Sequence, residues 1–540
     1  MADNPQSLPL EAPPPTWSPL RLPVFRMLWI TWVTSNICMW MNDVAAAWLM
    51  ISLTTSPVMI ALVQTASTLP VLLLGVPSGA LADILNRRSW YLSTQVWVAV
   101  NAVVLSIAVL TGVLSAPLLL ALTFSNGIGL AMRWPVYAAI IPELVPRREL
   151  QSAIALNAIA MNGSRIIGPI VAGALLATVG GAYVFLLNAA LSIFAGVVIW
   201  RWRTERKASV LPGERFVGAM RVGLQYVGQS PALRVVLLRV ALFFLQSTPL
   251  LALLPLVAKH MEGGGAGGAG VFTTLLASLG LGAISAALWL PRIRVLITRD
   301  RLLRDGSLLQ AAGMVAVGFA PNLYVAIPAM IIAGAAWITV VNTLTVAAQL
   351  ELPDWVRARG MSIYQMALMG ATSISAALWG KVADLSDVQW TFVFAAVAGI
   401  VGLVATRGMQ VGPAEGIDLT PARILKEPTP AFPIEHDRGP VMVTIEYLID
   451  PARAEEFKGV MRESRANRLQ KGALSWGLFH DTSEPGRYVE YFLDESWAEH
   501  LRRFDRMTAA DIELRDRRQS FHIGPQPPKV SRYVAEPVNR

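Results

Sequence analysis

The chain is poor in charge and in residues that form covalent or metal sites. Only 15% of its 540 residues are charged, whereas soluble domains average about 25%. It has one cysteine, Cys38, so neither an internal disulfide nor a cysteine-based metal centre can form. Its five histidines lack the spacing of zinc sites. The composition excludes an ordinary soluble enzyme and predicts no metal site.

Motifs for nucleotides and nucleic acids are lacking as well. No Gly-x-x-x-x-Gly-Lys-(Ser/Thr) phosphate loop occurs, which argues against ATP-driven chemistry. Residues 1–407 hold 26 basic and 15 acidic residues (+11), whereas residues 408–540 hold 19 and 21 (−2). Because no groove-reading or aromatic-interleaved basic face accompanies this excess, we expect contact with anionic lipid and none with nucleic acid. No cofactor is expected.

Long apolar runs take the place of these sites. The mean hydropathy is +0.50, and the recurring apolar runs are close to the length that crosses a ~30 Å hydrocarbon core as a helix. We expect twelve spans, at residues 27–50, 57–82, 89–114, 116–141, 151–177, 180–200, 235–258, 270–291, 306–321, 322–349, 361–380 and 388–406. The chain is therefore predicted to be an all-α membrane protein with an appended tail.

Basic residues set the expected orientation. If the N-terminus is cytoplasmic, the inner loops hold nearly all of the arginines, and the outer loops hold only Lys259 and Lys381. Both termini are then cytoplasmic, and a bacterial inner membrane is the expected location. The predicted organisation is an N-terminal segment, six spans, a basic loop, six spans, a Pro-rich linker and a small domain, at residues 1–24, 25–200, 201–232, 233–407, 408–440 and 441–535. An amphipathic helix lying on the membrane is expected at 215–226.

Short motifs carry a family resemblance. The loop after the second span reads Gly79-Ala-Leu-Ala-Asp83-Ile-Leu-Asn86-Arg87-Arg88. It resembles the signature of the major facilitator superfamily, except that Ile84 replaces a basic residue and Asn86 a glycine. The stretches Pro142-Glu-Leu-Val-Pro146, Arg165-Ile-Ile-Gly168-Pro169 and Pro353-Asp-Trp-Val-Arg357 resemble the enterobactin-exporter-like group, also described as transmembrane secretion effectors.

The resemblance implies a twelve-span major facilitator fold in two halves of six, and export of a small organic molecule, siderophore-like or drug-like, by alternating access. It also implies that Gly79, Asp83, Arg87 and Arg88 form a gate latch, although charges obeying the positive-inside rule would look the same. Small residues and a proline favour close helix packing in the second and fifth spans, either as an exporter motif or as generic membrane packing. These residues are Gly75, Gly168, Pro169 and Gly173.

One acid lies clearly inside a span. Asp43 is in the first span, and it is the candidate for coupling protons to transport because ionisable groups inside a bilayer are costly and usually functional. The alternative is an ordinary polar residue near the outer interface. Arg165 lies at a similar depth in the fifth span, so we expect it either to pair with Asp43 or to bind backbone carbonyl groups.

Polar residues inside the other spans are candidates for lining a central cavity that binds the transported molecule. They are Asn36, Gln64, Asn126, Gln246, Asn342 and Gln365.

The tail alternates strand and helix patterns after residue 440. Strands are expected at 441–448, around Leu474–Leu478, at 488–493 and near 530–533, with helices at 451–469 and after Ser496. This βαββαβ order is typical of an α+β ferredoxin-like unit. The domain resembles the dimeric α+β barrels of antibiotic-biosynthesis monooxygenases, some of which oxidise aromatic ligands without cofactors. Candidate pocket or interface residues are Trp476, His480, Trp497 and His500.

Three functions follow from these patterns. The first is a proton-driven exporter that is not an enzyme and whose partners are the bilayer, protons and a small molecule, with self-association through the tail. The second is an exporter fused to a monooxygenase-like or ligand-sensing tail. The third is a membrane sensor that transports nothing, which coupled transport in liposomes would exclude.

Overall fold

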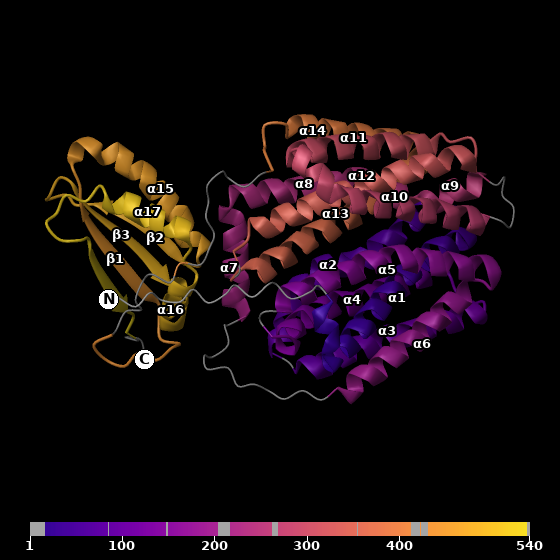
Figure 1. Cartoon of the computed structure of the whole chain (residues 1–540), viewed down its shortest axis with the longest axis horizontal. Coiled ribbons are helices and arrows are strands. Elements are labelled where there is room, and N and C mark those ends of the chain that lie inside the picture. Colours follow the sequence, from indigo (N-terminus) through magenta and orange to yellow (C-terminus); the bar gives the residue numbers. More distant parts are fainter. Residues whose placement is uncertain are drawn as a thin grey trace, which may run out of the picture.

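The computed structural model describes residues 17–84, 86–146, 149–202, 216–261, 268–353, 355–411, 422 and 430–536. The N-terminal segment up to residue 16, the basic stretch 203–215 and most of the expected linker lie outside these residues. Figure 1 shows a large bundle of roughly parallel helices with a small domain containing a sheet beside one of its ends. The tail domain lies at the opposite end of the bundle from helix α9 (Leu254–Met261).

A helix covers each of the twelve apolar segments. The N-terminal half holds α1 (Pro23–Leu53), α2 (Pro57–Ile84), α3 (Arg87–Leu110), α4 (Ala116–Leu144), α5 (Leu150–Thr178) and α6 (Gly181–Arg201). The C-terminal half holds α8 (Pro231–Ala252), α10 (Gly268–Leu296), α11 (Arg299–Gly318), α12 (Leu323–Leu350), α13 (Arg357–Leu385) and α14 (Val388–Ala405). Two further helices, α7 (Phe216–Gln229) and α9, stand before and after α8.

Nine segments of the described chain are long and apolar enough to cross a membrane. The long helices outside this set are α1, α11 and α13, and each is diluted by polar residues. Helix α1 contains Asn36, Asn42 and Asp43, and α11 begins with four charged residues in its first six, Arg299-Asp-Arg-Leu-Leu-Arg304. The chain is therefore a multi-pass membrane protein whose more polar helices lie among strongly apolar ones.

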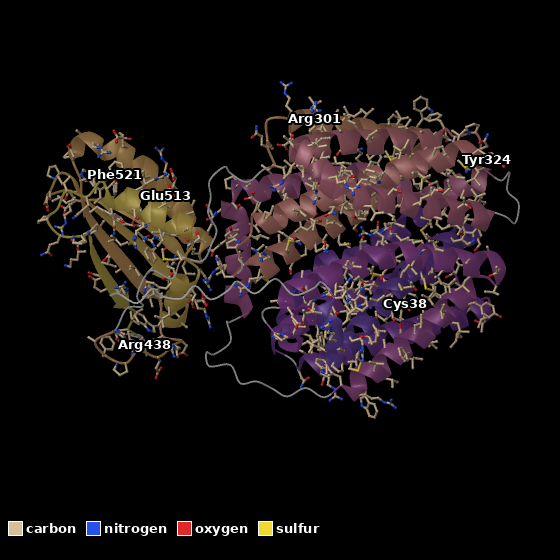
Figure 2. The ribbon with its side chains drawn as sticks, viewed as in Figure 1. Cys38, Arg301, Tyr324, Arg438, Glu513 and Phe521 are labelled. Atoms are coloured by element: carbon tan, nitrogen blue, oxygen red, sulfur yellow. The ribbon has the colours of Figure 1, made fainter. Side chains whose placement is uncertain are left out.

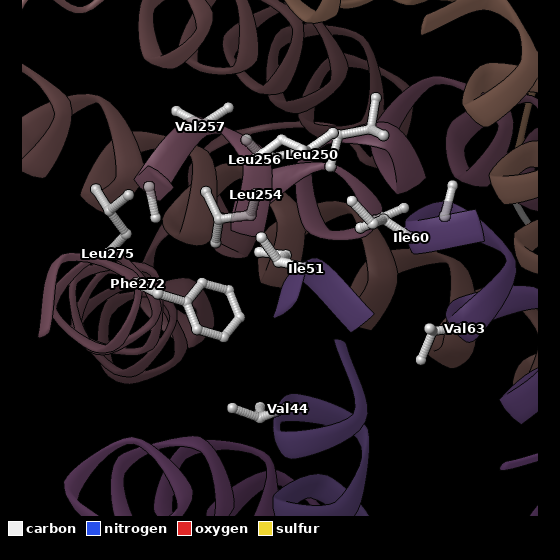
Figure 3. Packing of buried hydrophobic residues seen from close by; sticks show 14 of the residues in the cluster. Val44, Ile51, Ile60, Val63, Leu250, Leu254, Leu256, Val257, Phe272 and Leu275 are labelled. Atoms are coloured by element: carbon white, nitrogen blue, oxygen red, sulfur yellow. The ribbon is translucent and has the colours of Figure 1, made fainter. Parts of the chain in front are cut away.

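The two halves share one core at one end and keep separate cores at the other. The largest cluster of buried apolar side chains joins α1 and α2 to α8, α9 and α10, and Figure 3 shows Val44, Ile51 and Ile60 beside Leu254 and Phe272. A second cluster, from Tyr226 to Val411, belongs to α7 and the C-terminal half, and a third, from Phe25 to Trp202, to the N-terminal half. The halves are thus tightly joined at the α9 end.

A proline in α8 organises contacts between α8 and α13. Pro249 has no backbone N–H, so the carbonyl of Leu245, four residues earlier, loses its helical partner. That carbonyl accepts hydrogen bonds from Ser375 Oγ at 2.9 Å and Trp379 Nε1 at 2.7 Å, both from α13. Two side chains of one helix thereby satisfy a backbone group of another inside the bundle.

Small residues allow close helix contacts in α2 and α5. A side chain at Gly168 of α5 would collide with Trp40 of α1, and one at Gly173 would collide with Thr273 of α10. A side chain at Gly75 of α2 would meet Met366 of α13. Pro169 lies inside α5. The pairs Gly173–Thr273 and Gly75–Met366 join the two halves, so these small residues shape the interface across which the halves would move.

Helices α10 and α12 approach each other very closely. A Cβ atom at Gly334 would lie 2.0 Å from the carbonyl oxygen of Leu279, a backbone atom that cannot rotate away. We therefore expect Gly334→Ala to lower the stability by about 2 kcal/mol, because overpacking forces the helices apart. Thermal unfolding of the purified protein in detergent measures this. The control is Gly280→Ala in α10, whose Cβ would lie 3.5 Å from Ile166, an ordinary contact; equal losses in both variants would contradict the prediction.

The tail domain is a four-stranded antiparallel sheet with helices on one face. Its elements are β1 (Val441–Leu448), α15 (Ala454–Gln470), β2 (Ser475–His480), β3 (Arg487–Asp494), α16 (Trp497–Asp505), α17 (Ala509–Gln519) and β4 (Lys529–Val534). The strand order is β2-β3-β1-β4, and β1 aligns Val443 with Phe492 of β3 and Arg532 of β4. The expected strands and first two helices are present, and α17 is an addition.

Helix α7 packs against the tail. Arg221 forms an ion pair with Glu495 at 2.7 Å, Gln225 Nε2 donates to the carbonyl of Ala473 at 3.2 Å, and Gln470 Nε2 donates to that of Gln229 at 3.0 Å. The face predicted to lie on the membrane includes Leu224, whose side chain is half exposed. The helix expected there is therefore present, and side chains next to Leu224 around the helix hold the tail.

Chemical cross-linking tests this docking. In the double variant Arg221→Cys/Glu495→Cys, a short bismaleimide should join α7 to the tail, because the two side chains are in contact. The background should be low because Cys38, the only native cysteine, is buried. The control Arg221→Cys/Glu484→Cys places the second thiol in the turn at the other end of β3. Equal cross-linking in both variants, or none in the first, would contradict the docking.

Candidate functional site

A central cavity of about 100 Å³ lies between the two halves. Its walls come from α1, α2, α4 and α5 of the N-terminal half and from α8, α12 and α13 of the C-terminal half. Aromatic walls include Trp40, Trp134, Phe244 and Trp337. The cavity is therefore bounded by both halves, in the way that a site served by alternating access requires.

Asp43 and Arg165 both line this cavity. Asp43, from α1, accepts a hydrogen bond from Ser67 Oγ of α2 at 2.8 Å. Arg165, from α5, lies between two indole rings, with its guanidinium carbon 5.0 Å from the ring centre of Trp40 and 4.4 Å from that of Trp337. Asp43 and Arg165 therefore line the same cavity. In the described part of the chain, however, no hydrogen bond or ion pair joins them directly.

The Arg165 contact also bridges the halves. Trp40 belongs to α1 of the N-terminal half and Trp337 to α12 of the C-terminal half. A guanidinium over an aromatic ring is attracted by the ring quadrupole, more strongly where water is excluded. Arg165 therefore adds a contact across the cavity that any separation of the two halves would break.

Of the six polar residues expected to line the cavity, Gln64 does so, and the other five are not among the residues that line it. Gln246 lines a separate small pocket within the C-terminal half and donates to the carbonyl of Ser307 at 2.7 Å. Asn36 is buried and donates to the carbonyl of Trp32 at 2.7 Å. Asn126 is buried in α4, and Asn342 and Gln365 are half-buried in α12 and α13.

Small hydroxyl residues line the cavity instead, and the sequence did not single them out. Ser67, Thr68, Ser247, Thr248 and Thr372 all face it. Three of them also donate to a carbonyl one turn earlier in their own helix: Thr68 to Gln64, Thr248 to Phe244 and Thr372 to Leu368. A hydroxyl bonded in this way is compatible with an apolar helix, so sequence alone gives it no distinguishing signal.

The expected gate latch lies at the end of α2. Gly79 and Asp83 belong to this helix, but the burial and contacts of these two residues are not among the described features. Arg88 donates to the carbonyl of Trp200 at the end of α6, and Arg87 begins α3. Asn86, at the position where the superfamily signature has glycine, caps α3 by accepting from the backbone N–H of Ser89 at 3.2 Å. The latch itself stays a prediction.

The four tail residues lie at three places rather than in one pocket. Trp476 donates to Glu490 at 3.0 Å, in the middle of β3. His500 contacts Asp494 at 2.9 Å and lies near Trp497, at the end of β3. His480 stacks on Tyr488, near the strand's beginning, with ring centres 4.4 Å apart.

Buried ion pairs occupy the space between the sheet and its helices. The fully buried carboxylate of Glu490 accepts from Ser464 at 3.0 Å and Arg468 at 3.1 Å, and Arg518 lies 3.7 Å away. Burial alone would raise the pKa of this carboxyl, but the two arginines outweigh it and hold the pKa at about 2. Asp494 is likewise paired with Arg503, which lowers its pKa against the effect of burial.

No group of three or more His, Cys, Asp or Glu residues that could hold a metal ion occurs in the described ranges.

Solved transporters share the fold of the helical part. It matches a nucleoside transporter, NupG, with a TM-score of 0.55 and 12% identity, covering 72% of this chain and 98% of that one. A bacterial homologue of the human lysosomal transporter Spinster, in an inward-facing and occupied conformation, matches with a TM-score of 0.57 and 16% identity, over 72% and 97%. A D-xylose-proton symporter gives 0.54 and 15%, over 70% and 97%. The fold is that of a helical membrane transporter.

Sequence comparison identifies the family within that class. A family model described as transmembrane secretion effector matches residues 14–540, so the chain belongs to this family of major-facilitator-type transporters. The staphyloferrin A transporter of Staphylococcus aureus (strain NCTC 8325 / PS 47) is 22% identical over 366 residues, 67% of this chain and 90% of that protein. An uncharacterized MFS-type transporter of Bacillus subtilis (strain 168), YfiS, is 29% identical over 200 residues, 35% of this chain and 46% of that protein.

Proposed function

We propose that the protein is a proton-coupled secondary exporter of small organic molecules in the bacterial inner membrane. The observation that carries the proposal is the cavity between the two halves, which holds one acid and one arginine among aromatic, aliphatic and uncharged polar side chains. Asp43 would bind and release the coupled proton, because it is the acid that lines the cavity. Siderophore-like or drug-like molecules are the proposed cargo class, in keeping with the staphyloferrin A transporter among the relatives.

Alternating access is the proposed mechanism. The halves share a core at the α9 end and keep separate cores at the tail end, so the described state is closed at the α9 end. With the tail on the cytoplasmic side, that closed end is the outer one. Opening it would require the close pair Gly173–Thr273 to separate as the halves rock.

The proposed topology has twelve spans and both termini in the cytoplasm. The nine strongly apolar segments, with α1, α11 and α13 added, give twelve. Figure 2 is consistent with this orientation: Arg301 lies toward the tail side, and Tyr324, an aromatic residue typical of an interface, lies at the far end. Reporter fusions at the ends of successive helices test it, and a tail exposed outside the inner membrane would contradict it.

The tail is proposed to be ferredoxin-like and to act as a structural attachment rather than an enzyme. Its element order and its sheet order β2-β3-β1-β4 support the ferredoxin-like assignment. Beneath the sheet, Trp476 and His500 are hydrogen-bonded to the carboxylates of Glu490 and Asp494. The uncovered face of the sheet, with Phe479 and Tyr533 exposed, is the surface proposed for self-association, which the mass of the purified particle would test.

The decisive experiment for the proposed function is transport in proteoliposomes. Purified protein is reconstituted, a pH gradient is imposed, and movement of a panel of siderophore-like and drug-like compounds is followed. Transport that needs the gradient and stops when a protonophore collapses it supports the proposal. Protein that moves nothing in either direction would favour the sensor, and oxidation of aromatic compounds by the protein would favour the fused enzyme.

A further inference from the structure

Arg165 is a cation without an anion. Its guanidinium is held between the rings of Trp40 and Trp337, and its buried Nε atom has no hydrogen-bond partner. Among the described residues no carboxylate pairs with it. A charge taken out of water is costly unless a counter-ion or hydrogen bonds replace the lost solvent. Two aromatic faces supply only part of that replacement.

The rest of the cavity does not complete the site. The acid on the same wall, Asp43, is bonded to Ser67. The remaining polar lining consists of one amide, Gln64, and uncharged hydroxyl groups, and the other walls are aromatic or aliphatic. The cavity therefore presents one donor-rich cation, held between two rings, to which none of the described acceptors of the lining is bonded.

We propose that Arg165 binds a carboxylate group of the transported molecule. A guanidinium offers parallel N–H donors that match the two oxygens of a carboxylate. A phosphate dianion would call for a second cation, and none lies among the residues that line this cavity. The aromatic rings of Trp134 and Phe244 would cover the organic part of the ligand. This inference rests on the proposed transport function, because it takes the cavity to be the cargo site.

The position of Arg165 gives the ligand a second role. Trp337 of the C-terminal half and Trp40 of the N-terminal half both hold its guanidinium. A carboxylate bound to Arg165 would supply the missing counter-ion to the side chain that contacts both halves. Ligand binding would thereby alter the contacts of Arg165 with both halves, as a step that triggers their relative motion requires.

The test compares two probes that differ in charge and hardly in shape. Salicylate carries a carboxylate, and salicylamide carries a neutral amide in its place. Equilibrium dialysis of the purified full-length protein should show at least about tenfold tighter binding of salicylate, the preference expected of one charge-assisted contact. Arg165→Gln should abolish that preference, and Arg165→Lys should keep part of it because the charge remains.

A matched control removes another arginine of the helical part. Arg239 donates to the carbonyls of Thr406 and Met409 at the end of α14 and does not line the cavity. Arg239→Gln should keep the preference for salicylate. The proposal is overturned if the native protein does not prefer salicylate, if Arg165→Gln retains the preference, or if inorganic phosphate displaces salicylate more effectively than unlabelled salicylate does.

Transport assays separate this inference from the proposed function. If salicylate is preferred through Arg165 but no compound crosses the membrane under a pH gradient, the transport proposal fails and the carboxylate site stands. If gradient-driven transport occurs and is unaffected by Arg165→Gln for both acids and neutral compounds, the carboxylate site fails and transport stands.

Discussion

Asp43→Asn is expected to reduce transport driven by a pH gradient to the level of empty liposomes. Asparagine has nearly the shape of aspartate and can still accept the hydrogen bond from Ser67 Oγ. It cannot bind and release a proton, so the coupling step is lost while the cavity keeps its form. Initial rates in proteoliposomes with an imposed gradient, compared with exchange of labelled for unlabelled compound without one, measure the two properties separately.

The control is an acid outside the cavity. Asp384, near the end of α13, forms an ion pair with Lys381 at 3.2 Å that is largely open to solvent. Asp384→Asn makes the same chemical change and should leave gradient-driven transport intact. Full coupling in Asp43→Asn would show that the proton is carried elsewhere, and loss of exchange as well as coupling would show that the substitution damages the site itself.

The charges of the cavity also bear on the driving force. If the loaded carrier holds ionised Asp43, Arg165 and a carboxylate ligand, its net charge is −1, and the empty carrier with neutral Asp43 carries +1. In a cell that is negative inside, the first moves outward and the second inward along the potential. Each such movement is worth about 2.3 kcal/mol per 100 mV. The acid and the arginine would then let both the proton gradient and the potential favour export.

Local pattern sufficed for most elements but not for all of them. Apolar length placed a helix on each expected span, and strict alternation placed β1 at Val441–Leu448. Helix α17 was not predicted because its buried residues, Asp511 and Arg518, are charged, so it has no apolar stripe. Its capping box, Thr508 with Asp511, was the available signal. The sequence did not predict where α8 ends for the opposite reason: the helix stops at Leu253, within a run that is apolar throughout and so carries no signal of a break.

The cavity was harder to predict than the helices. Rarity identified Asp43 and Arg165, because an ionisable residue inside a span stands out against its neighbours. An amide such as Gln246 does not reveal which way it points, and here it turns into its own half to bond the carbonyl of Ser307. That choice depends on which helices surround it, information that no single span contains. The contact of Arg165 with Trp337 likewise joins residues far apart in the sequence.

Glu490→Gln is expected to destabilise the tail domain by roughly 3 kcal/mol. The substitution leaves Arg468 and Arg518 buried beneath the sheet without their counter-ion, and removal of one partner of a buried pair typically costs 3–5 kcal/mol. Hydrogen exchange of the full-length protein, read at the amides of β1 and β3, should show protection falling by about a hundredfold. Glu446→Gln is the matched control, because Glu446 pairs with Arg487 on the open face, and should change protection little.

Acid should reproduce the effect of this substitution in the native protein. The carboxyl of Glu490 has its ordinary pKa of 4.5 when the chain is unfolded and a pKa of about 2 when folded. Because the folded pKa is the lower one, the stabilisation is fully present above about pH 4.5 and is lost as the pH falls toward 2. The protection of β3 should therefore decline over that interval in the native protein and less steeply in Glu490→Gln. Parallel declines would show that other carboxylates, such as Asp494, dominate the acid response.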